Sequence, residues 1–330
     1  MAKVLVSEKY LHDIANAIRV KLDSQSTYTP AQMAAEIADI TGSISGTITP
    51  STDADKVLVT DSSLTAIANA IRAKLDVATT YTPAQMAEAI LSIQAAGPSI
   101  ASWASGTDEE VAAMIDAAHA GTIDLQQDGG WAVGDVRTIV VGAFNDTIGT
   151  AHAQQSVDIV ISSFEEYMGC GNVMQFDFVD SLAELSPMNS SKTNSGGYGA
   201  MAMKTTIMPA LVDALPAWIK NRLITFSCLS SAGRGSSSIL TVTDNKLALR
   251  AETEVMDRHY SYEGEGSLIP YYATAANRVK KLGHSGSAEV WWLRSPANVG
   301  NSQFCRVSAA GSYDYLMANY QDGIAPFGCL

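Results

Sequence analysis

The chain has 330 residues, 47% of them apolar and 17% charged, so it can bury a sizeable core and has room for roughly two or three domains. Its net charge of −13 disfavours unspecific binding to nucleic acid, because contacts to phosphate need clustered lysine and arginine. The sequence contains neither a membrane span of roughly 18 apolar residues nor a secretory leader, so we expect a protein made in the cytoplasm, without a signal peptide and without membrane insertion.

An internal duplication occupies the N-terminal third of the chain. Residues 3–40 recur as residues 56–93, 53 positions further along, with nearly the same stretches in both copies, such as IANAIR and YTPAQMA. Chance does not produce such a match, so the chain contains two copies of one module.

Each copy has the pattern of two short helices. In the second copy Leu64, Ile67 and Ile71 recur at helical spacing, and Thr82 with Pro83 is typical of the N-cap and first residue of the next helix. Two such helices bury little surface, so each copy needs a partner: a neighbouring copy, another subunit or a larger particle. We predict helical repeats at residues 1–41 and 56–94, separated by a flexible linker at 42–55 and followed by a second linker at 95–102.

The sequence from residue 103 onward has a different pattern of elements. A helix is predicted at 108–120, short β-like runs follow at 138–141 and 157–161, and a helix at 205–215 ends before Pro216. Loops rich in Gly, Ser and Asn join these elements. Residues 103–330 are therefore predicted to form one mixed α+β domain.

The sequence contains no catalytic signature. It has no G-x-S-x-G elbow, phosphate loop, H-E-x-x-H motif or dinucleotide-binding glycine motif, and its five histidines lack metal-ligand spacing. The glycine-rich run at 195–199 lacks the lysine of a phosphate loop and is interpreted as a structural turn. Glu263 and Glu265 lie in a Gly-rich loop and are interpreted as solvated. We therefore expect no enzyme, no cofactor and no metal.

The four cysteines are Cys170, Cys228, Cys305 and Cys329, which lie far apart and form no C-x-x-C pair. Such spacing is typical neither of a disulfide framework nor of a zinc knuckle. Buried free thiols are therefore expected rather than a bridge.

The run EVWWLRSP at residues 289–296 predicts a strand that ends at a proline. Adjacent residues of a strand point to opposite faces, so Trp291 and Trp292 indicate a strand covered on both sides. We interpret both tryptophans as core residues, and the alternative is an aromatic binding platform.

Residues 298–322 are rich in Asn, Ser, Tyr, Gly and Asp. This mixture is typical of antibody binding loops, in which tyrosine supplies contact area and small polar residues supply adaptable hydrogen bonds. An ordinary polar loop is the alternative, and composition alone does not decide between the two.

Five segments carry a resemblance to a known family. They are GGYGAMAMKTTIMPALVDALP at 196–216, TDNKL at 243–247, EGEG at 263–266, WWLRSP at 291–296 and GIAPFGCL at 323–330. In this order they resemble the C-type-lectin-like domains of gut-phage and bacterial proteins, especially the variable proteins of diversity-generating retroelements, over residues 103–330. The duplicated unit separately resembles repeats of phage tail and fibre proteins. The calcium-binding lectin motifs E-P-N or Q-P-D with W-N-D are missing, which argues against calcium-mediated sugar binding.

The resemblance also implies which residues face a ligand. Retroelement copying in that family mutates adenines, mostly in Asn-type codons, which then yield Asn, Ser, Tyr, Asp, Cys or Gly. The implied variable, ligand-facing positions are Asn298, Asn301, Ser302, Cys305, Ser312, Tyr313, Asp314, Tyr315, Asn319, Tyr320 and Asp322. Poorer candidates are Gln303, Met317 and Gln321. The implied scaffold residues are Trp291, Trp292, Leu293, Arg294, Ile324 and Phe327.

The implied function is adhesion by a virion protein made in the bacterial cytoplasm. The C-terminal domain would bind a host-cell surface protein or glycan, and the repeats would attach the chain to other phage tail proteins, with a homotrimer among the expected arrangements. Two alternatives stay open. One is a bacterial surface or carbohydrate-binding protein on the same fold, and the other is an oxidase related to formylglycine-generating enzymes, for which only Cys305 and Cys329 could form the reactive pair.

Overall fold

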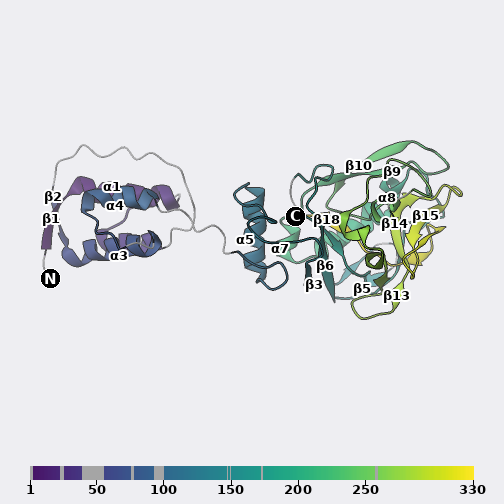
Figure 1. Ribbon diagram of the computed structural model, residues 1–330, viewed down its shortest axis with the longest axis horizontal. Helices are drawn as coiled ribbons and strands as arrows, with labels where there is room; N and C mark the ends of the chain where they lie inside the picture. Colours follow the sequence, from purple (N-terminus) through teal and green to yellow (C-terminus); the bar gives the residue numbers. More distant parts are fainter. Residues whose placement is uncertain are drawn as a thin grey trace. The chain divides into compact units, whose positions relative to one another are not determined.

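The computed structural model describes residues 3–22, 26–38, 56–75, 78–92, 100–146, 148, 150–171, 174–256 and 259–330. The chain is of the mixed α and β class and divides into two compact units, residues 1–97 and 98–330 (Figure 1). The linker predicted at 42–55 and residues 95–99 of the second linker lie outside the described residues.

The N-terminal unit contains both copies of the repeat. Its elements are β1 (Lys3–Ser7), α1 (Glu8–Leu22), α2 (Pro30–Ala38), β2 (Lys56–Thr60), α3 (Asp61–Leu75) and α4 (Pro83–Ser92). The second helix of each copy begins at its proline, as predicted, because a proline has no N–H to leave unsatisfied in the first turn. A strand opens each copy, which the helical pattern did not predict.

The two copies pack against each other. Strands β1 and β2 pair antiparallel, helix α1 lies against α4, and α2 lies against α3. The apolar stripes meet in one core in which Ile14, Ile18, Ile67 and Ile71 are fully buried. The partner that each short copy requires is therefore the other copy.

The C-terminal unit begins with α5 (Asp108–His119), which confirms the helix predicted at 108–120. Thr107 caps it, because its hydroxyl accepts from the N–H of Glu110 while the Glu110 carboxylate accepts from the N–H of Thr107. The helix predicted at 205–215 is formed by a π-helical turn, Met203–Ile207, that leads into α6 (Met208–Ala214), and α7 (Ala217–Lys220) and α8 (Glu252–Met256) follow.

A five-stranded sheet forms the centre of this unit. Its order is β11 (Leu247–Ala248), β18 (Phe327–Cys329), β7 (Gln175–Phe178), β6 (Gln155–Ser163) and β3 (Val136–Val141). Short strand pairs flank it: β4 (Phe144–Asn145) with β5 (Ala151–His152), β8 (Ser186–Pro187) with β17 (Gln321–Asp322), β9 (Phe226–Ser231) with β10 (Ile239–Asn245), and β12 (Lys280–Lys281) with β13 (Ala288–Glu289).

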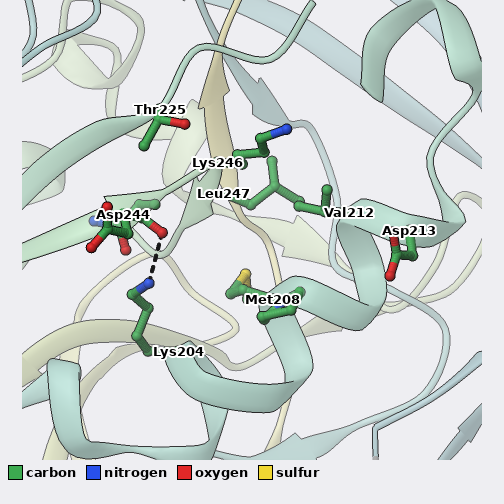
Figure 2. A pocket seen from close by; sticks show the side chains of 10 residues that line it. Lys204, Met208, Val212, Asp213, Thr225, Asp244, Lys246 and Leu247 are labelled. Atoms are coloured by element: carbon green, nitrogen blue, oxygen red, sulfur yellow. Dashed lines mark hydrogen bonds between the residues drawn. The ribbon is translucent and has the colours of Figure 1, made fainter. Parts of the chain in front are cut away.

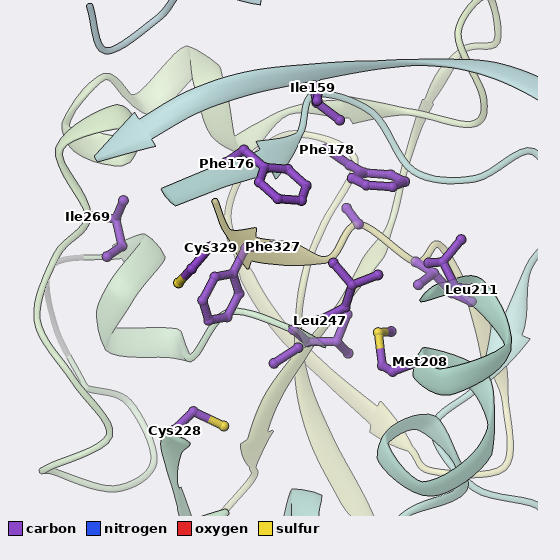
Figure 3. Packing of buried hydrophobic residues seen from close by; sticks show 14 of the residues in the cluster. Ile159, Phe176, Phe178, Met208, Leu211, Cys228, Leu247, Ile269, Phe327 and Cys329 are labelled. Atoms are coloured by element: carbon purple, nitrogen blue, oxygen red, sulfur yellow. The ribbon is translucent and has the colours of Figure 1, made fainter. Parts of the chain in front are cut away.

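Apolar side chains cover both faces of the central sheet (Figure 3). On one face Phe176 and Leu247 pack together beneath α6, and a side chain at Gly328 would collide with the Phe176 ring, since its Cβ would lie 2.8 Å away. On the other face Phe327 packs under the guanidinium of Arg250, 3.6 Å from its ring centre. The central sheet therefore lies within the core, with packed side chains on both of its faces.

A second sheet carries the region of interest. It consists of β14 (Trp291–Pro296), β15 (Gln303–Val307) and β16 (Tyr313–Met317), all antiparallel. Trp291 and Trp292 are both fully buried, which confirms that they are core residues on a strand covered on both sides. Each indole N–H donates to a backbone carbonyl 2.9 Å away, at Arg278 and Ser186 respectively.

The cysteines correct one expectation. Cys170 and Cys329 form a disulfide with their Cα atoms 6.0 Å apart, whereas Cys228 and Cys305 are buried free thiols. The expectation of four free thiols was therefore wrong for two of them. The two bonded residues lie 159 positions apart, and only the sheet brings the end of β18 next to the turn that holds Cys170.

Candidate binding site

Five of the eleven residues predicted to face a ligand lie on one hairpin, formed by β15 and β16, and the other six flank this hairpin in the chain. The composition of 298–322 is typical of loops, but Tyr313–Met317 forms the edge strand of the sheet. Tyr313 lies opposite Val307 and Tyr315 opposite Cys305. Because side chains alternate along a strand, Tyr313 and Tyr315 share one face and Asp314 points to the other.

Three tyrosines form an exposed aromatic surface, which we call the tyrosine face: Tyr260, Tyr313 and Tyr315. The rings of Tyr260 and Tyr313 stack at 4.3 Å between centroids with 18° between their planes, and Tyr315 follows 6.2 Å from Tyr313. Tyr260 is 45% exposed and Tyr315 is 42% exposed. The face therefore presents aromatic area to solvent at one place.

Polar groups beneath the tyrosine face hold it in position. The hydroxyl of Ser261 lies 3.2 Å from both the Cys305 sulfur and the Tyr313 hydroxyl, and the Cys305 thiol donates to Oε2 of Glu252 at 3.3 Å. The other oxygen of Glu252 accepts from the backbone N–H groups of Tyr260 and Ser261. Burial raises the pKa of Glu252 and raises the pKa of the Cys305 thiol well above its usual range. These hydrogen bonds therefore fix the loop that carries Tyr260 against the sheet.

Hydrogen bonds from Asn194 hold the turn between β14 and β15. The buried side chain of Asn194 donates to the carbonyls of Gly300 and Gln303 at 3.0 Å, and its backbone N–H donates to Asn301. The carbonyl of Ser302 then accepts from Ala318, just after β16. The segment with Asn301 and Ser302 and the turn that begins at Ala318 therefore meet at one end of the hairpin.

The structure brings most, but not all, of the predicted positions to the surface. Exposed side chains are Asn298, Asn301, Ser312, Tyr315, Asn319 and Tyr320, and half-buried ones are Ser302, Tyr313 and Asp314. Cys305 is fully buried and Asp322 is 6% exposed, so the expectation that these two face a ligand is corrected.

The surroundings of these two residues explain the corrections. Cys305 lies on the central strand, covered by Ser261 and the loop above it. Asp322 and Asp314 both bind Arg306, at 3.1 and 2.7 Å, on the face of the hairpin opposite the tyrosines. Burial raises the pKa of Asp322 to about 6, against the lowering effect of Arg306.

The predicted scaffold residues are all fully buried: Trp291, Trp292, Leu293, Arg294, Ile324 and Phe327. The guanidinium of Arg294 uses every one of its N–H donors, with two to the Glu254 carboxylate at 2.7 Å and the others to the carbonyls of Leu229, Leu249 and Glu265. A saturated, buried ion pair of this kind fixes β14, the strand that pairs with β15 of the hairpin.

Sequence reasoning missed Tyr260, Ser261 and Glu252. The first two lie in the stretch HYSYEGEG, where two tyrosines beside two glycines resemble the composition of the predicted display segment. That stretch lies about forty residues earlier in the chain and was considered only for its carboxylates and for the resemblance that EGEG carries. Glu252 carries no local signal, since its role depends on burial alone.

The pair of thiols considered for an oxidase does not exist here. Cys329 is bonded to Cys170, and Cys305 is a buried thiol whose pKa burial raises. A thiol reacts as its thiolate, which this environment disfavours.

Two cavities lie away from the tyrosine face. The larger, of about 360 Å³, lies between α6 and the segment TDNKL and includes Lys204, Asp213, Asp244 and Lys246 (Figure 2). The Lys204 ammonium donates to the backbone carbonyl of Asp244 at 2.9 Å. With two cationic and two anionic side chains around it, this cavity favours neither sign of charge.

The second cavity, of about 300 Å³, is lined by four glutamates, among them Glu254 and Glu265. Glu265 is fully buried, so the interpretation of this residue as solvated was wrong; its neighbour Glu263 is exposed beside His259. Desolvation raises the pKa of Glu265 to about 7, although Ser295, Ser231 and Arg294 act to lower it.

Within the described ranges, no three His, Cys, Asp or Glu side chains gather in a way that could hold a metal ion. In that same part of the chain, no helix is long and apolar enough to cross a bilayer.

Comparison with known families gives a match over part of the chain. Residues 182–330 match a family described as a domain of unknown function (DUF6273). This match covers the second sheet, the tyrosine face, the whole lining of the larger cavity and part of the lining of the second. No curated protein and no solved structure matches the chain.

Proposed function

We propose that the chain is an adhesion protein whose C-terminal unit recognises a protein or glycan on a host-cell surface, without catalysis. One observation carries the proposal. Two exposed tyrosines, with a third between them that stacks on one of the two, lie on an edge strand and a loop that partly buried hydrogen bonds hold in place.

Such a surface favours binding for physical reasons. Tyrosine offers a large contact area and loses little conformational entropy, because it has only two rotatable side-chain bonds. A surface that is already ordered avoids the further cost of ordering loops when a ligand binds. Affinity would then come from a few aromatic anchors, with Asn298, Asn301 and Asn319 supplying hydrogen bonds around them.

The scaffold is proposed to be C-type-lectin-like, of the type that retroelement-diversified phage proteins use. The saturated Arg294 and the buried tryptophans support it, because a display surface whose residues change needs a core that does not depend on them. The N-terminal unit is proposed to attach the chain to other tail proteins of the virion, with a homotrimer as the arrangement to test.

A bacterial surface protein on the same scaffold is the rival. A phage structural gene cluster with a reverse transcriptase next to the gene would favour the virion protein, and its absence would favour the rival.

The experiment is a binding screen with the fluorescently labelled full chain on a glycan array and a panel of bacterial strains. Any strain or glycan that binds is then tested with Tyr260→Ala/Tyr315→Ala and with the control Val140→Ala, which removes an exposed side chain from β3. The proposal predicts at least about tenfold weaker binding for the tyrosine variant, since aromatic anchors contribute more than 1 kcal/mol each, and unchanged binding for the control. Equal binding by all three proteins contradicts it.

A further inference from the structure

Hydrogen bonds around the buried Asn194 join four segments at one end of the hairpin. The backbone N–H of Asn194 donates to the carbonyl of Asn301 at 3.0 Å, and its Oδ1 accepts from the backbone N–H of Arg234 at 2.9 Å. The N–H of Asn189 donates to the carbonyl of Ala318 at 2.9 Å. We call the surface that these segments share the Asn194 surface; it consists of residues 189–197, 232–238, 298–303 and 318–321.

The loop between β9 and β10 presents Arg234 to solvent on this surface. Gly233 approaches Asn194 so closely that a Cβ at this position would lie 1.9 Å from the Asn194 carbonyl oxygen. Arg234 has φ +54°, a left-handed conformation that is unfavourable for a residue with a side chain. Its hydrogen bond to Asn194 stabilises this conformation. The backbone from which the guanidinium extends is therefore fixed.

The Asn194 surface has two cations and no carboxylate of its own. Lys192 and Arg234 are exposed, and within the described ranges neither cationic group has a hydrogen bond or an ion pair. The four segments contain no Asp or Glu, although the whole chain has 34 acidic and 21 basic residues. The exposed Glu263, in a neighbouring loop, pairs with His259 at 3.0 Å. The local charge therefore attracts an anion, whereas the net charge of −13 repels it.

Amide and hydroxyl groups surround the two cations. Tyr320 is 51% exposed and adds an aromatic ring, which offers apolar contact to the C–H face of a sugar. Amides and hydroxyls both donate and accept hydrogen bonds, as sugar hydroxyls do, whereas the carboxylates of an acidic peptide only accept. The composition therefore favours an acidic sugar over an acidic peptide. The exposed or half-buried amides and hydroxyls include Ser191, Ser237, Asn301, Ser302 and Asn319.

We propose that the Asn194 surface binds an acidic glycan of the host-cell surface, with Lys192 and Arg234 as the groups that recognise its carboxylates or phosphates. The planar guanidinium of an arginine suits paired hydrogen bonds with either anion. Neither cation is among the implied variable positions, so the requirement for negative charge would stay while Asn301, Asn319 and Tyr320 select the sugar. This inference rests on the function proposed above and names the class of ligand.

The test is calorimetric titration of the full chain at low ionic strength with four oligomers of equal length. Hexagalacturonate carries carboxylates on sugars, a glycerol phosphate hexamer carries phosphates on a polyol, hexaglutamate carries carboxylates on a peptide, and maltohexaose is a neutral sugar. The proposal predicts that hexagalacturonate or the glycerol phosphate hexamer binds about tenfold or more tightly than both maltohexaose and hexaglutamate, and the tighter of the two identifies the anion. Binding of hexaglutamate or maltohexaose that is as tight as that of the acidic oligomers overturns it, as does a lack of binding by both acidic oligomers.

Substitutions of the cations locate the site. Lys192→Gln/Arg234→Gln should weaken binding of the tighter acidic oligomer about tenfold. The control Lys246→Gln removes an exposed charge beside the larger cavity and should leave the affinity within about twofold. If the double variant does not fold, Lys192→Gln changes an exposed residue outside the strained loop and should weaken binding about threefold. Unchanged affinity in the variant that folds overturns the assignment.

Failure of this inference can be distinguished from failure of the proposed function. The screen with Tyr260→Ala/Tyr315→Ala tests adhesion through the tyrosine face and leaves Lys192 and Arg234 in place. A strain or glycan that binds the full chain, loses binding in the tyrosine variant and keeps it in Lys192→Gln/Arg234→Gln would support adhesion and contradict recognition of an acidic glycan.

Discussion

Leu5 lies opposite Leu58 in the antiparallel pair of β1 and β2, and Leu58 is the residue that occupies the same position in the second copy of the repeat. Lys3 lies opposite Thr60 and Ser7 opposite Lys56, so exchanging the two copies leaves the pairing unchanged. The helices follow the same rule, with α1 against α4 and α2 against α3. The two copies thus form the isologous contact of a symmetric dimer within one chain.

Deleting one copy should therefore create an intermolecular contact. A chain that begins at residue 56 keeps β2, α3 and α4 but loses the copy that covers their apolar stripe. We expect it to have twice as many chains per particle as the full-length protein, because the remaining copies pair between molecules. Light scattering after size-exclusion chromatography measures this number, and the same number of chains for both proteins would show that the copies do not pair in this way.

The C-terminal unit should fold without the repeats. Residues 98–330 form a compact unit with their own core. We expect a fragment of these residues to unfold in one cooperative transition, as measured by circular dichroism on heating. Aggregation of the fragment under conditions in which the full chain is well folded would argue against an independent domain.

Core and display residues should respond differently to truncation. Trp292→Ala removes a fully buried ring and should lower the free energy of unfolding by about 3–5 kcal/mol. Tyr315→Ala changes a side chain that is 42% exposed and should cost less than about 1 kcal/mol. Denaturant titration of both variants checks this, and similar losses would mean that the tyrosine face is part of the core.

Glu265 should make stability depend on pH. Burial raises the pKa of its carboxyl group from an ordinary value of 4.5 to about 7 in the folded chain. Of the charged groups near it, Arg294 acts to lower this pKa and Glu252 to raise it. Between these values the unfolded chain releases the proton first, so the contribution of this residue to stability falls as pH rises and is constant above about pH 7. The free energy of unfolding of Glu265→Gln, relative to that of the native chain, should therefore rise by about 2–3 kcal/mol between pH 5 and pH 8, at about 1.4 kcal/mol per pKa unit.

Denaturant titrations at several pH values measure that gain, with Glu263→Gln as the control. A stability difference between Glu265→Gln and the native chain that is the same at pH 5 and pH 8 would mean that Glu265 titrates normally.

Patterns of neighbouring residues in the sequence were sufficient to predict some of the structural features. Pro83 predicted where a helix begins, Thr107 lies where a capping residue is expected, and the adjacent tryptophans predicted a strand covered on both faces. In each case the physical cause lies within a few neighbouring residues.

Long-range contacts decided the features that the sequence did not reveal. Tyr313 and Tyr315 lie in a segment whose composition is typical of loops, yet pairing with β15 makes it a strand. Glu265 lies between two glycines, and its burial arises from Ser231 and Arg294, which are distant in the chain. The bond between Cys170 and Cys329 joins residues 159 positions apart.

The central claim is that residues 298–322 form a surface that changes while its scaffold does not. Sequencing the codons for residues 291–330 in many isolates that carry this gene measures that directly. We predict that substitutions concentrate at the exposed or half-buried positions of the hairpin and of the segments next to it in the chain, namely Asn298, Asn301, Ser302, Ser312, Tyr313, Asp314, Tyr315, Asn319 and Tyr320. We also predict that the buried Trp291, Trp292 and Arg294 stay unchanged. Substitutions spread evenly over both groups, or no variation at the hairpin, would contradict the account.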